Sequence, residues 1–368
     1  MISIELCLTN RCNLQCKYCF ESNTDNINLK KSYKDMDFET AKKIINFYIK
    51  KSNQLNEYQN DKTINLIFFG GEPLLKFDLM KQIVSYAKYV SSVLDIVFTY
   101  SITTNATIFS KEIADFLIEN KVNAMLSIDG NKVGHDANRI MKNGEGSFKL
   151  IQENYNNIKY FIKNNNCKTI IKMILDPSNV SYFYEGILFL SNFSTSISFG
   201  LNYEVKWNQK DYDIFVSELK KILEDYDVIR EKDSYIEEIE VCIQAFTVHD
   251  RERNPSFCGA GKWKFFVTPD GEFYPCARFD SISECNIGNI YNDFNDNIKK
   301  FREFSFDNHE CKDCKLRLSC NSTCIYYNYL FNKDIYCLDD FICMIYRTIN
   351  YYCLKMLKVF QVAERGKS

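Results

Sequence analysis

The sequence predicts an α/β protein, built as a partial (β/α)6 barrel or as an open doubly wound sheet, followed by a cysteine-rich and largely irregular C-terminal part. Strand-like and helix-like segments alternate from residue 1 to about residue 205, which is typical of βαβ units and a parallel sheet. Three cysteines follow the first of these strands directly. From about residue 251, cysteines and Gly-Pro-Asp turns crowd the chain and regular periodicity fades.

Six short apolar segments are expected to be the strands. They are Ile2–Leu8, Ile64–Phe69, Ile96–Thr103, Asn123–Ile128, Thr169–Leu175 and Ser196–Leu201. The segments expected to be helices are Phe38–Lys51, Asp78–Val93, Lys111–Glu119, Phe148–Lys163 and Val180–Leu190. In either architecture the chemistry belongs at the carboxyl ends of the strands, which is where the first cysteines fall.

Three domains are expected along the chain. Residues 1–208 form the α/β core domain, residues 209–250 a charged helical connector, and residues 251–368 a cysteine-rich domain that closes with a helix at about Asp340–Val362. Within this last domain Pro269-Asp270-Gly271 predicts a turn between two short strands, a hairpin that would present Cys276.

Composition excludes several classes of partner. The net charge is only −2 and charges of both signs are interspersed, which gives no reason to expect nucleic acid or an anionic membrane. The first residues lack the cationic and apolar regions of a signal peptide, and no stretch reaches the ~20 apolar residues of a membrane span. We therefore expect a cytoplasmic protein, in which 16 cysteines indicate metal binding more than disulfides.

The strongest single motif is Cys12-Asn-Leu-Gln-Cys16-Lys-Tyr-Cys19. Three thiolates on one loop can hold three irons of a [4Fe–4S] cluster and leave the fourth iron open to a small molecule. A structural zinc ion would require a fourth ligand, and neither a His nor another Cys lies just downstream. The triplet therefore favours an iron–sulfur cluster over zinc.

A second set of cysteines lies near the C-terminus. The pattern is Cys258-x12-Gly271-x4-Cys276, then Cys311-x2-Cys314-x5-Cys320-x3-Cys324, then Cys343. On the residues alone, iron–sulfur clusters and zinc are equally open here, because both accept ligation by four thiolates.

Together these motifs closely resemble the radical S-adenosylmethionine (SAM) superfamily. The cysteine triplet with Tyr18 before its last member resembles the site of the core cluster, and Gly70-Gly71-Glu72-Pro73 resembles the motif for the SAM amino group. Thr104-Asn105 resembles the ribose-contacting position, and Ser127 with Arg139 resembles a segment that reaches the methionyl carboxylate. The C-terminal cysteines match every fixed spacing of the SPASM extension.

The resemblance implies the cofactors and the residues that bind them. Cys12, Cys16 and Cys19 would hold a [4Fe–4S] cluster that binds SAM, whose reductive cleavage gives a 5′-deoxyadenosyl radical. The expected SAM contacts are Tyr18, Gly70, Gly71, Glu72, Thr104, Asn105, Ser127 and Arg139. His135 is expected to be structural.

The same resemblance implies two auxiliary iron–sulfur clusters, expected to be [4Fe–4S]. One would use Cys258, Cys276 and Cys324, and the other Cys311, Cys314, Cys320 and Cys343. The fourth ligand of the first stays open among Cys242, Cys285, Cys337, a substrate thiolate and a free iron site.

Most SPASM enzymes act on peptides or proteins, so the resemblance implies hydrogen abstraction from a ribosomally made peptide, with a thioether or other crosslink as the product. The alternative is an anaerobic sulfatase maturase, which makes formylglycine. Those enzymes carry an Asp after the Cys equivalent to Cys276, where this chain has Ala277; Asp280 is then the candidate base. The Tyr-Pro-Cys-x-Arg-Phe run around Cys276 looks more like the thioether-forming maturases.

Expected partners follow from the same reasoning. The chain begins with its first predicted strand, with no winged-helix domain before it, so we expect the peptide to be held by the catalytic domains or by a separate leader-binding protein. A flavodoxin or ferredoxin would supply electrons. Two further alternatives are dehydrogenation of a small-molecule alcohol or amine, and a non-catalytic metal-binding scaffold.

Overall fold

The computed structural model describes residues 1–21, 34–55, 62–247, 258–280, 282–305, 307, 309–317, 319–320 and 324–365. Its chain divides into two compact units. The first unit contains residues 1–127, 139–169 and 259–303, and the second contains residues 128–138, 170–258 and 304–368. Each unit therefore combines segments that are distant from one another along the sequence. The predicted boundary between residues 250 and 251 lies outside the described residues, and the domain bounds stay a prediction.

The strands of the first unit follow one another in the order β11-β10-β9-β8-β1-β2-β3-β4. Their bounds are β1 Ile2–Thr9, β2 Thr63–Gly70, β3 Val97–Thr104, β4 Val122–Ser127, β8 Lys264–Val267, β9 Glu272–Tyr274, β10 Gly288–Asn289 and β11 Asp293–Phe294. The pairs from β8 through β1 to β4 are parallel, and those from β8 to β11 are antiparallel. All eight residues of β1 are buried, as expected of a strand with neighbours on both sides.

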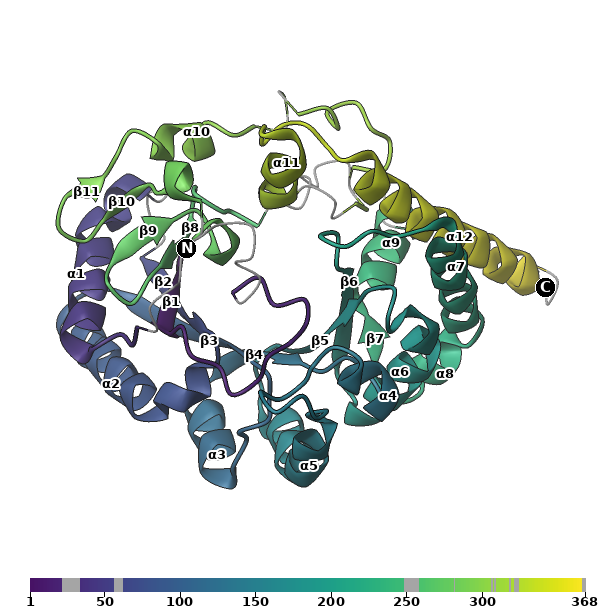
Figure 1. The fold of residues 1–368 in the computed structure, drawn as a ribbon, viewed down its shortest axis with the longest axis horizontal. Helices are drawn as coiled ribbons and strands as arrows, with labels where there is room; N and C mark the ends of the chain where they lie inside the picture. The colour runs from purple at the N-terminus through teal and green to yellow at the C-terminus, as the bar shows by residue number, and fades with distance from the viewer. Residues whose placement is uncertain are drawn as a thin grey trace. The chain divides into compact units, whose positions relative to one another are not determined.

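Helices cover the outer side of this sheet (Figure 1). They are α1 Phe38–Leu55, α2 Phe77–Val93, α3 Lys111–Glu119 and α5 Phe148–Asn164. The unit also contains α10 Ile298–Arg302 and the short turns η2 Pro73–Lys76, η5 Ala277–Phe279 and η6 Ser283–Cys285. α5 buries Ile151, Ile158 and Phe161, whose spacing places them on one helical face. α1 packs on α2, and α3 packs on α5.

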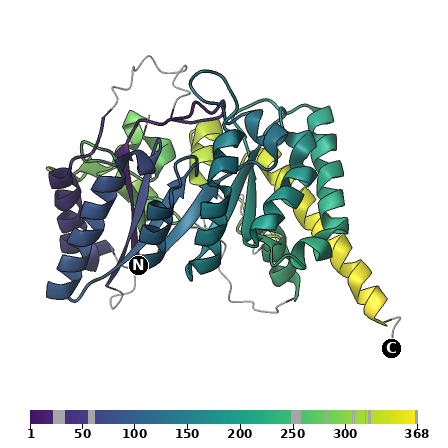
Figure 2. The same cartoon turned by 90° about the horizontal axis from the view of Figure 1, so that it is seen from below.

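The second unit has its own parallel strands, in the order β5-β6-β7. These are β5 Thr169–Leu175, β6 Ser196–Leu201 and β7 Tyr235–Ile236. Its helices are α4 Lys132–Asp136, α6 Phe183–Leu190, α7 Gln209–Glu224, α8 Tyr226–Arg230, α9 Glu237–Thr247, α11 Ile325–Asn332 and α12 Asp340–Arg365, with η3 Val180–Tyr182 and η4 Ser191–Phe193. The long helix α12, yellow in Figure 2, packs on α9 and α7.

The alternation of strands and helices predicted from the sequence is confirmed, as is the hairpin between β8 and β9. Gly271 in its turn has a φ of +87°, a conformation that favours glycine. One helix begins later than predicted, at Phe183, because a 3₁₀ turn over Val180–Tyr182 precedes it. The sequence did not indicate β7, nor the parallel pairing of β8 with β1.

The described helices are all too short or too polar to cross a lipid bilayer.

An aromatic cluster joins α1 to the C-terminal strands of the first unit. Phe273 is fully buried, and its ring centroid lies 4.9 Å from that of Phe47, 5.7 Å from that of Tyr48 and 5.4 Å from that of Phe294. This cluster therefore fixes the segment that leads into Cys276.

We predict that Phe273→Ala lowers the free energy of unfolding by about 3–5 kcal/mol, because it removes a fully buried ring and leaves a cavity. Tyr291→Ala is the matched control, because Tyr291 is 67% exposed. This variant should change the free energy of unfolding by less than about 0.5 kcal/mol. Urea midpoints of the two variants measure the difference, and equal midpoints would contradict the role of the cluster.

Candidate functional site

The cysteine triplet lies on the loop that follows β1. The loop turns tightly, with the Cys19 N–H donating to the Cys16 carbonyl at 3.1 Å and the Leu14 N–H donating to Cys12 Sγ at 3.4 Å. The Gln15 N–H donates to the Ile140 carbonyl at 2.8 Å and anchors the loop to the segment before α5. All three thiols are partly accessible.

The electrostatics of the triplet fit an iron–sulfur cluster. The pKa of Cys12 is raised to about 12, chiefly by burial and in part by the negative charges of Glu72, Cys16 and Cys19. A thiol with a raised pKa binds as a thiolate when metal cations offset the cost of its charge. Among the described residues, no three His, Cys, Asp or Glu side chains converge on a point that one metal ion could occupy. The triplet offers three thiolates, one fewer than a structural zinc ion normally takes, which fits a [4Fe–4S] cluster with one open iron.

Two glycines let the end of β2 approach this loop. Gly70 has a φ of +130°, and a Cβ there would lie 2.3 Å from the Thr9 carbonyl oxygen. A Cβ on Gly71 would lie 2.3 Å from the Arg11 carbonyl oxygen. The N–H of Gly71 donates to the Thr9 carbonyl at 2.8 Å, so the two loops are joined through their backbones.

Glu72 is fully buried behind these glycines. Its carboxylate accepts hydrogen bonds from Leu74 N at 3.0 Å, Thr104 Oγ1 at 2.7 Å and Asn105 N at 2.8 Å. Burial raises its pKa to about 7, although these hydrogen bonds act in the opposite direction. Glu72 thus ties the loop after β2 to the end of β3, and its predicted contact with the SAM ammonium group stays a prediction.

The remaining predicted SAM contacts fall in the same unit. Thr104 and Asn105 are buried where β3 ends, and Ser127 is the half-buried last residue of β4. The guanidinium carbon of Arg139 lies 5.3 Å from the centroid of the Tyr18 ring, a cation–π contact that brings a cation beside the cluster loop.

The C-terminal cysteines are divided between the units. In the first unit, Cys276 precedes η5, and the Ala277 N–H donates to Glu5 Oε2 at 3.4 Å. In the second unit, burial raises the pKa of Cys311 to about 11, with further contributions from the charges of Cys320, Cys314 and Cys343. The charges of these three cysteines thus act on Cys311, and a cluster shared by the four stays a prediction.

Cys343, which the resemblance implies as the fourth member of this group, and Cys337 have different neighbours. Cys343 lies in the first turn of α12 and interacts with Cys314. The Cys337 thiol instead donates to Asp334 Oδ2 at 3.7 Å. Cys324 precedes α11, whose N-terminus favours a thiolate. Cys258 is exposed, so its thiol is accessible for ligation.

Comparisons with known proteins decide the family. The profile of the radical SAM superfamily matches residues 6–178, and that of the SPASM iron–sulfur cluster-binding domain matches residues 258–315. An uncharacterized protein of Methanocaldococcus jannaschii is 31% identical, with 77% of this chain and 86% of the relative covered. This chain belongs to the radical SAM superfamily.

Two other relatives of this radical SAM enzyme have named activities. A cysteine-type anaerobic sulfatase-maturating enzyme of Clostridium novyi is 28% identical over 86% of this chain and 85% of its own length. The radical SAM cyclopropyl synthase TigE of Paramaledivibacter caminithermalis is 27% identical over 53% of this chain and 40% of its own length.

Solved structures share the fold. Native anSMEcpe with bound AdoMet superimposes with a TM-score of 0.74 at 21% identity, covering 98% of this chain and 99% of its own. Streptococcus suis SuiB bound to precursor peptide SuiA gives a TM-score of 0.57 at 19% identity, with 93% and 75% covered. The radical SAM fold with a C-terminal SPASM domain, predicted as a partial barrel, is thereby confirmed.

The cofactors of this radical SAM enzyme are a [4Fe–4S] cluster with SAM in the first domain and auxiliary iron–sulfur clusters in the SPASM domain. The chemistry they supply when bound is one-electron reduction of SAM to a radical that removes hydrogen from the substrate. The chain is an enzyme of this superfamily, so the alternative of a non-catalytic metal-binding scaffold is wrong.

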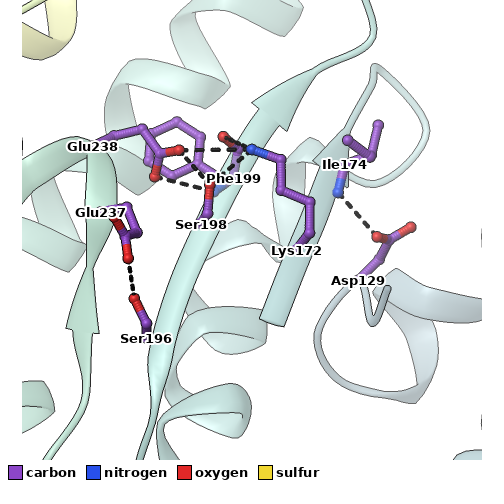
Figure 3. A network of polar contacts seen from close by, with 8 residues as sticks. All are labelled: Asp129, Lys172, Ile174, Ser196, Ser198, Phe199, Glu237 and Glu238. Atoms are coloured by element: carbon purple, nitrogen blue, oxygen red, sulfur yellow. Dashed lines mark hydrogen bonds and ion pairs between the residues drawn. The ribbon is translucent and has the colours of Figure 1, made fainter. Parts of the chain in front are cut away.

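His135, expected to be structural, is fully buried and accepts a hydrogen bond from Asp129 N at 3.2 Å. The Asp129 carboxylate in turn accepts from Ile174 N at 2.9 Å and caps the end of β5 (Figure 3). The segment after Ser127 is therefore held in place by the hydrogen bond between Asp129 and β5.

Sequence reasoning missed two polar contacts on the strands. Lys172 on β5 donates to Ser198 Oγ and the Phe199 carbonyl, both at 2.8 Å, and lies 3.7 Å from Glu238 (Figure 3). Glu5 on β1 forms an ion pair with Lys264 on β8 at 2.7 Å. The available signal was a charged residue in the middle of an apolar strand, which requires a buried partner.

We predict that Gly71→Ala reduces SAM cleavage by about 100-fold, the scale expected when a catalytic loop is misplaced by about 1 Å. The new Cβ would collide with the Arg11 carbonyl and the Cys12 amide nitrogen. Gly200→Ala is the control, because its Cβ would meet nothing closer than 3.4 Å. Production of 5′-deoxyadenosine measures both, and full activity of Gly71→Ala would contradict the tight packing.

We also predict that Cys343→Ala loses about four irons per chain while Cys337→Ala retains them, because Cys343 interacts electrostatically with Cys311 and Cys314, whereas the Cys337 thiol is bonded to Asp334. Iron and sulfide are counted after anaerobic reconstitution. Loss of iron from the Cys337 variant alone would reverse the assignment.

Proposed function

We propose that this radical SAM enzyme matures a ribosomally made precursor peptide and forms a thioether crosslink. The observation that carries the proposal is the environment of Ala277, which is 6% exposed and packs with Cys7 and Phe266. Phe20, Phe69 and Tyr274 pack against the same cluster. The acid that the sulfatase maturases carry at this position is thus replaced by a methyl group in apolar surroundings.

Relatives support a peptide as the substrate. TigE is a cyclopropyl synthase, and SuiB has been solved with a precursor peptide. Together with the Tyr-Pro-Cys-x-Arg-Phe run around Cys276, they favour a crosslink as the product.

Each part of the first unit has a proposed role in binding SAM. Cys12, Cys16 and Cys19 hold the cluster, and Gly70 and Gly71, which pack against the cluster loop, contact the amino group through their backbone. Arg139, stacked on Tyr18, supplies the cation for the methionyl carboxylate, since a guanidinium binds a carboxylate through two parallel hydrogen bonds.

Two auxiliary clusters are proposed, with the ligands that the resemblance implies. Two candidates for the fourth ligand of the first cluster have other neighbours: Cys242 is buried beside Cys353, and Cys337 donates to Asp334. Cys285 is buried in η6. These placements support an iron left open, to which a substrate thiolate can bind.

Sulfatase maturation is the second candidate, favoured by the Clostridium novyi relative. Its proton acceptor would be Asp280, which follows η5; burial, and to a lesser extent the charge of Asp280, raises the pKa of the nearby Tyr274. Glu5, bonded to Ala277 N, is a second carboxylate at the same turn.

The partners proposed for the peptide-modifying enzyme are a flavodoxin or ferredoxin, which supplies electrons, and a separate leader-binding protein.

We predict that a short peptide encoded beside this gene loses two hydrogens per modified site when it is co-expressed anaerobically with the enzyme. Its cysteines should then resist alkylation, because their sulfur has become part of a thioether. Exact mass with and without alkylation measures both.

The Cys12→Ala/Cys16→Ala/Cys19→Ala variant is the control and should leave the peptide unchanged. Loss of hydrogen with free thiols would indicate carbon–carbon, ether or dehydrogenation chemistry. An unchanged peptide mass, alongside active SAM cleavage, would contradict the proposal and favour a sulfatase or a small molecule.

A further inference from the structure

The side chain of Asn105 lies between the end of β3 and the cluster loop. Its Nδ2 is 2.9 Å from Asn13 Oδ1 and 3.7 Å from Cys12 Sγ. Its Oδ1 accepts from Thr107 N at 3.0 Å and from Thr107 Oγ1 at 2.5 Å. Both hydrogens of the amide and its oxygen are therefore engaged inside the protein.

The orientation of this amide follows from its partners. The backbone N–H of Thr107 can only donate, so the oxygen of Asn105 must face Thr107 and its NH₂ group must face Cys12. Asn13 is oriented in the same way, because its Nδ2 donates to Thr107 Oγ1 at 2.8 Å and leaves its oxygen toward Asn105.

The backbone of Asn105 is held as firmly as its side chain. Its N–H donates to the buried carboxylate of Glu72 at 2.8 Å, and the preceding Thr104 hydroxyl donates to the same group at 2.7 Å. Asn105 is 7% exposed. The donor is thus positioned before any cofactor binds.

We propose that Asn105 is a positioning residue for the core cluster, whose amide donates a hydrogen bond to the Cys12 thiolate and raises the reduction potential of the cluster. Hydrogen bonds to ligand sulfurs stabilise the reduced, more negative state, and outer-shell donors fix the orientation of the ligand. The inference rests on Cys12 being a ligand of that cluster.

This role differs from the ribose contact that the sequence motif implies. Both amide hydrogens already have acceptors, so a ribose hydroxyl could take one only by displacing Asn13 or Cys12. Asn105 would then link the occupancy of the SAM site to the electronic state of the cluster.

The test is a redox titration of the reconstituted enzyme without SAM, followed by electron paramagnetic resonance. The core cluster is identified as the signal that changes when SAM is added. We expect its potential to become more negative in Asn105→Ala, which removes the donor. The potential should fall further in Asn105→Asp, which places a negative acceptor beside the thiolate. The potentials of the auxiliary clusters should not move.

Asn120→Ala is the matched control. Asn120 is also a buried asparagine of the first unit, but its Nδ2 donates to the Phe116 carbonyl at 2.7 Å. Its variant should leave the core potential unchanged, which separates the specific contact from a general loss of packing.

An unchanged core potential in both Asn105 variants, with weaker SAM binding, would overturn the inference and make Asn105 a SAM ligand only. If those variants lose the cluster, Thr107→Val serves instead, because it keeps the backbone N–H and removes the hydroxyl that orients both asparagines. It should lower the potential by a smaller amount, and an unchanged value would overturn the inference. If the wild-type enzyme gives no signal that changes when SAM is added, Cys12 is not a ligand of a SAM-binding cluster. The inference about Asn105, which rests on that assignment, is then overturned as well.

Discussion

The carbonyl oxygens of Thr9 and Arg11 leave no room for a side chain at Gly70 or Gly71, and the candidate site depends on that close approach. It extends the contact between β1 and β2 past the end of the regular ladder, so the cluster loop is bonded to the loop after β2. Glu72 is thereby placed deep enough to bind the end of β3. Three loops that follow three neighbouring strands become one rigid surface, on which SAM and its cluster can be bound together.

Local patterns account for what the sequence could predict of the fold. Alternation of apolar segments is a property of neighbouring residues. The strands, the helices and the hairpin at Gly271 could therefore be predicted from the sequence. The pairing of β8 with β1 joins residues that are distant along the chain, and no local pattern encodes it. Lys172 and Glu5 posed the same difficulty, because their partners Glu238 and Lys264 lie on other elements.

The candidate site, like the fold, could be predicted from the sequence only in part. The resemblance of the cysteine pattern to the SPASM extension implied the ligand sets, and in the structure the charge of Cys314 contributes to the raised pKa of Cys343, after burial. The surroundings of Glu72 and Asn105 could not be foreseen, because hydrogen-bond partners depend on how the loops meet. A motif identifies which residues belong to a site, whereas only the fold shows which of their atoms remain available to a ligand.

The parallel pairing of β1 with β8 also has a consequence for synthesis of the chain. Ser3 pairs with Lys264, so the first strand made stays unpaired on that side until most of the chain has left the ribosome. At synthesis rates of about 5–20 residues per second, this interval is on the order of tens of seconds. An open strand edge during that time can pair with another nascent chain, so the late synthesis of β8 leaves β1 exposed to aggregation.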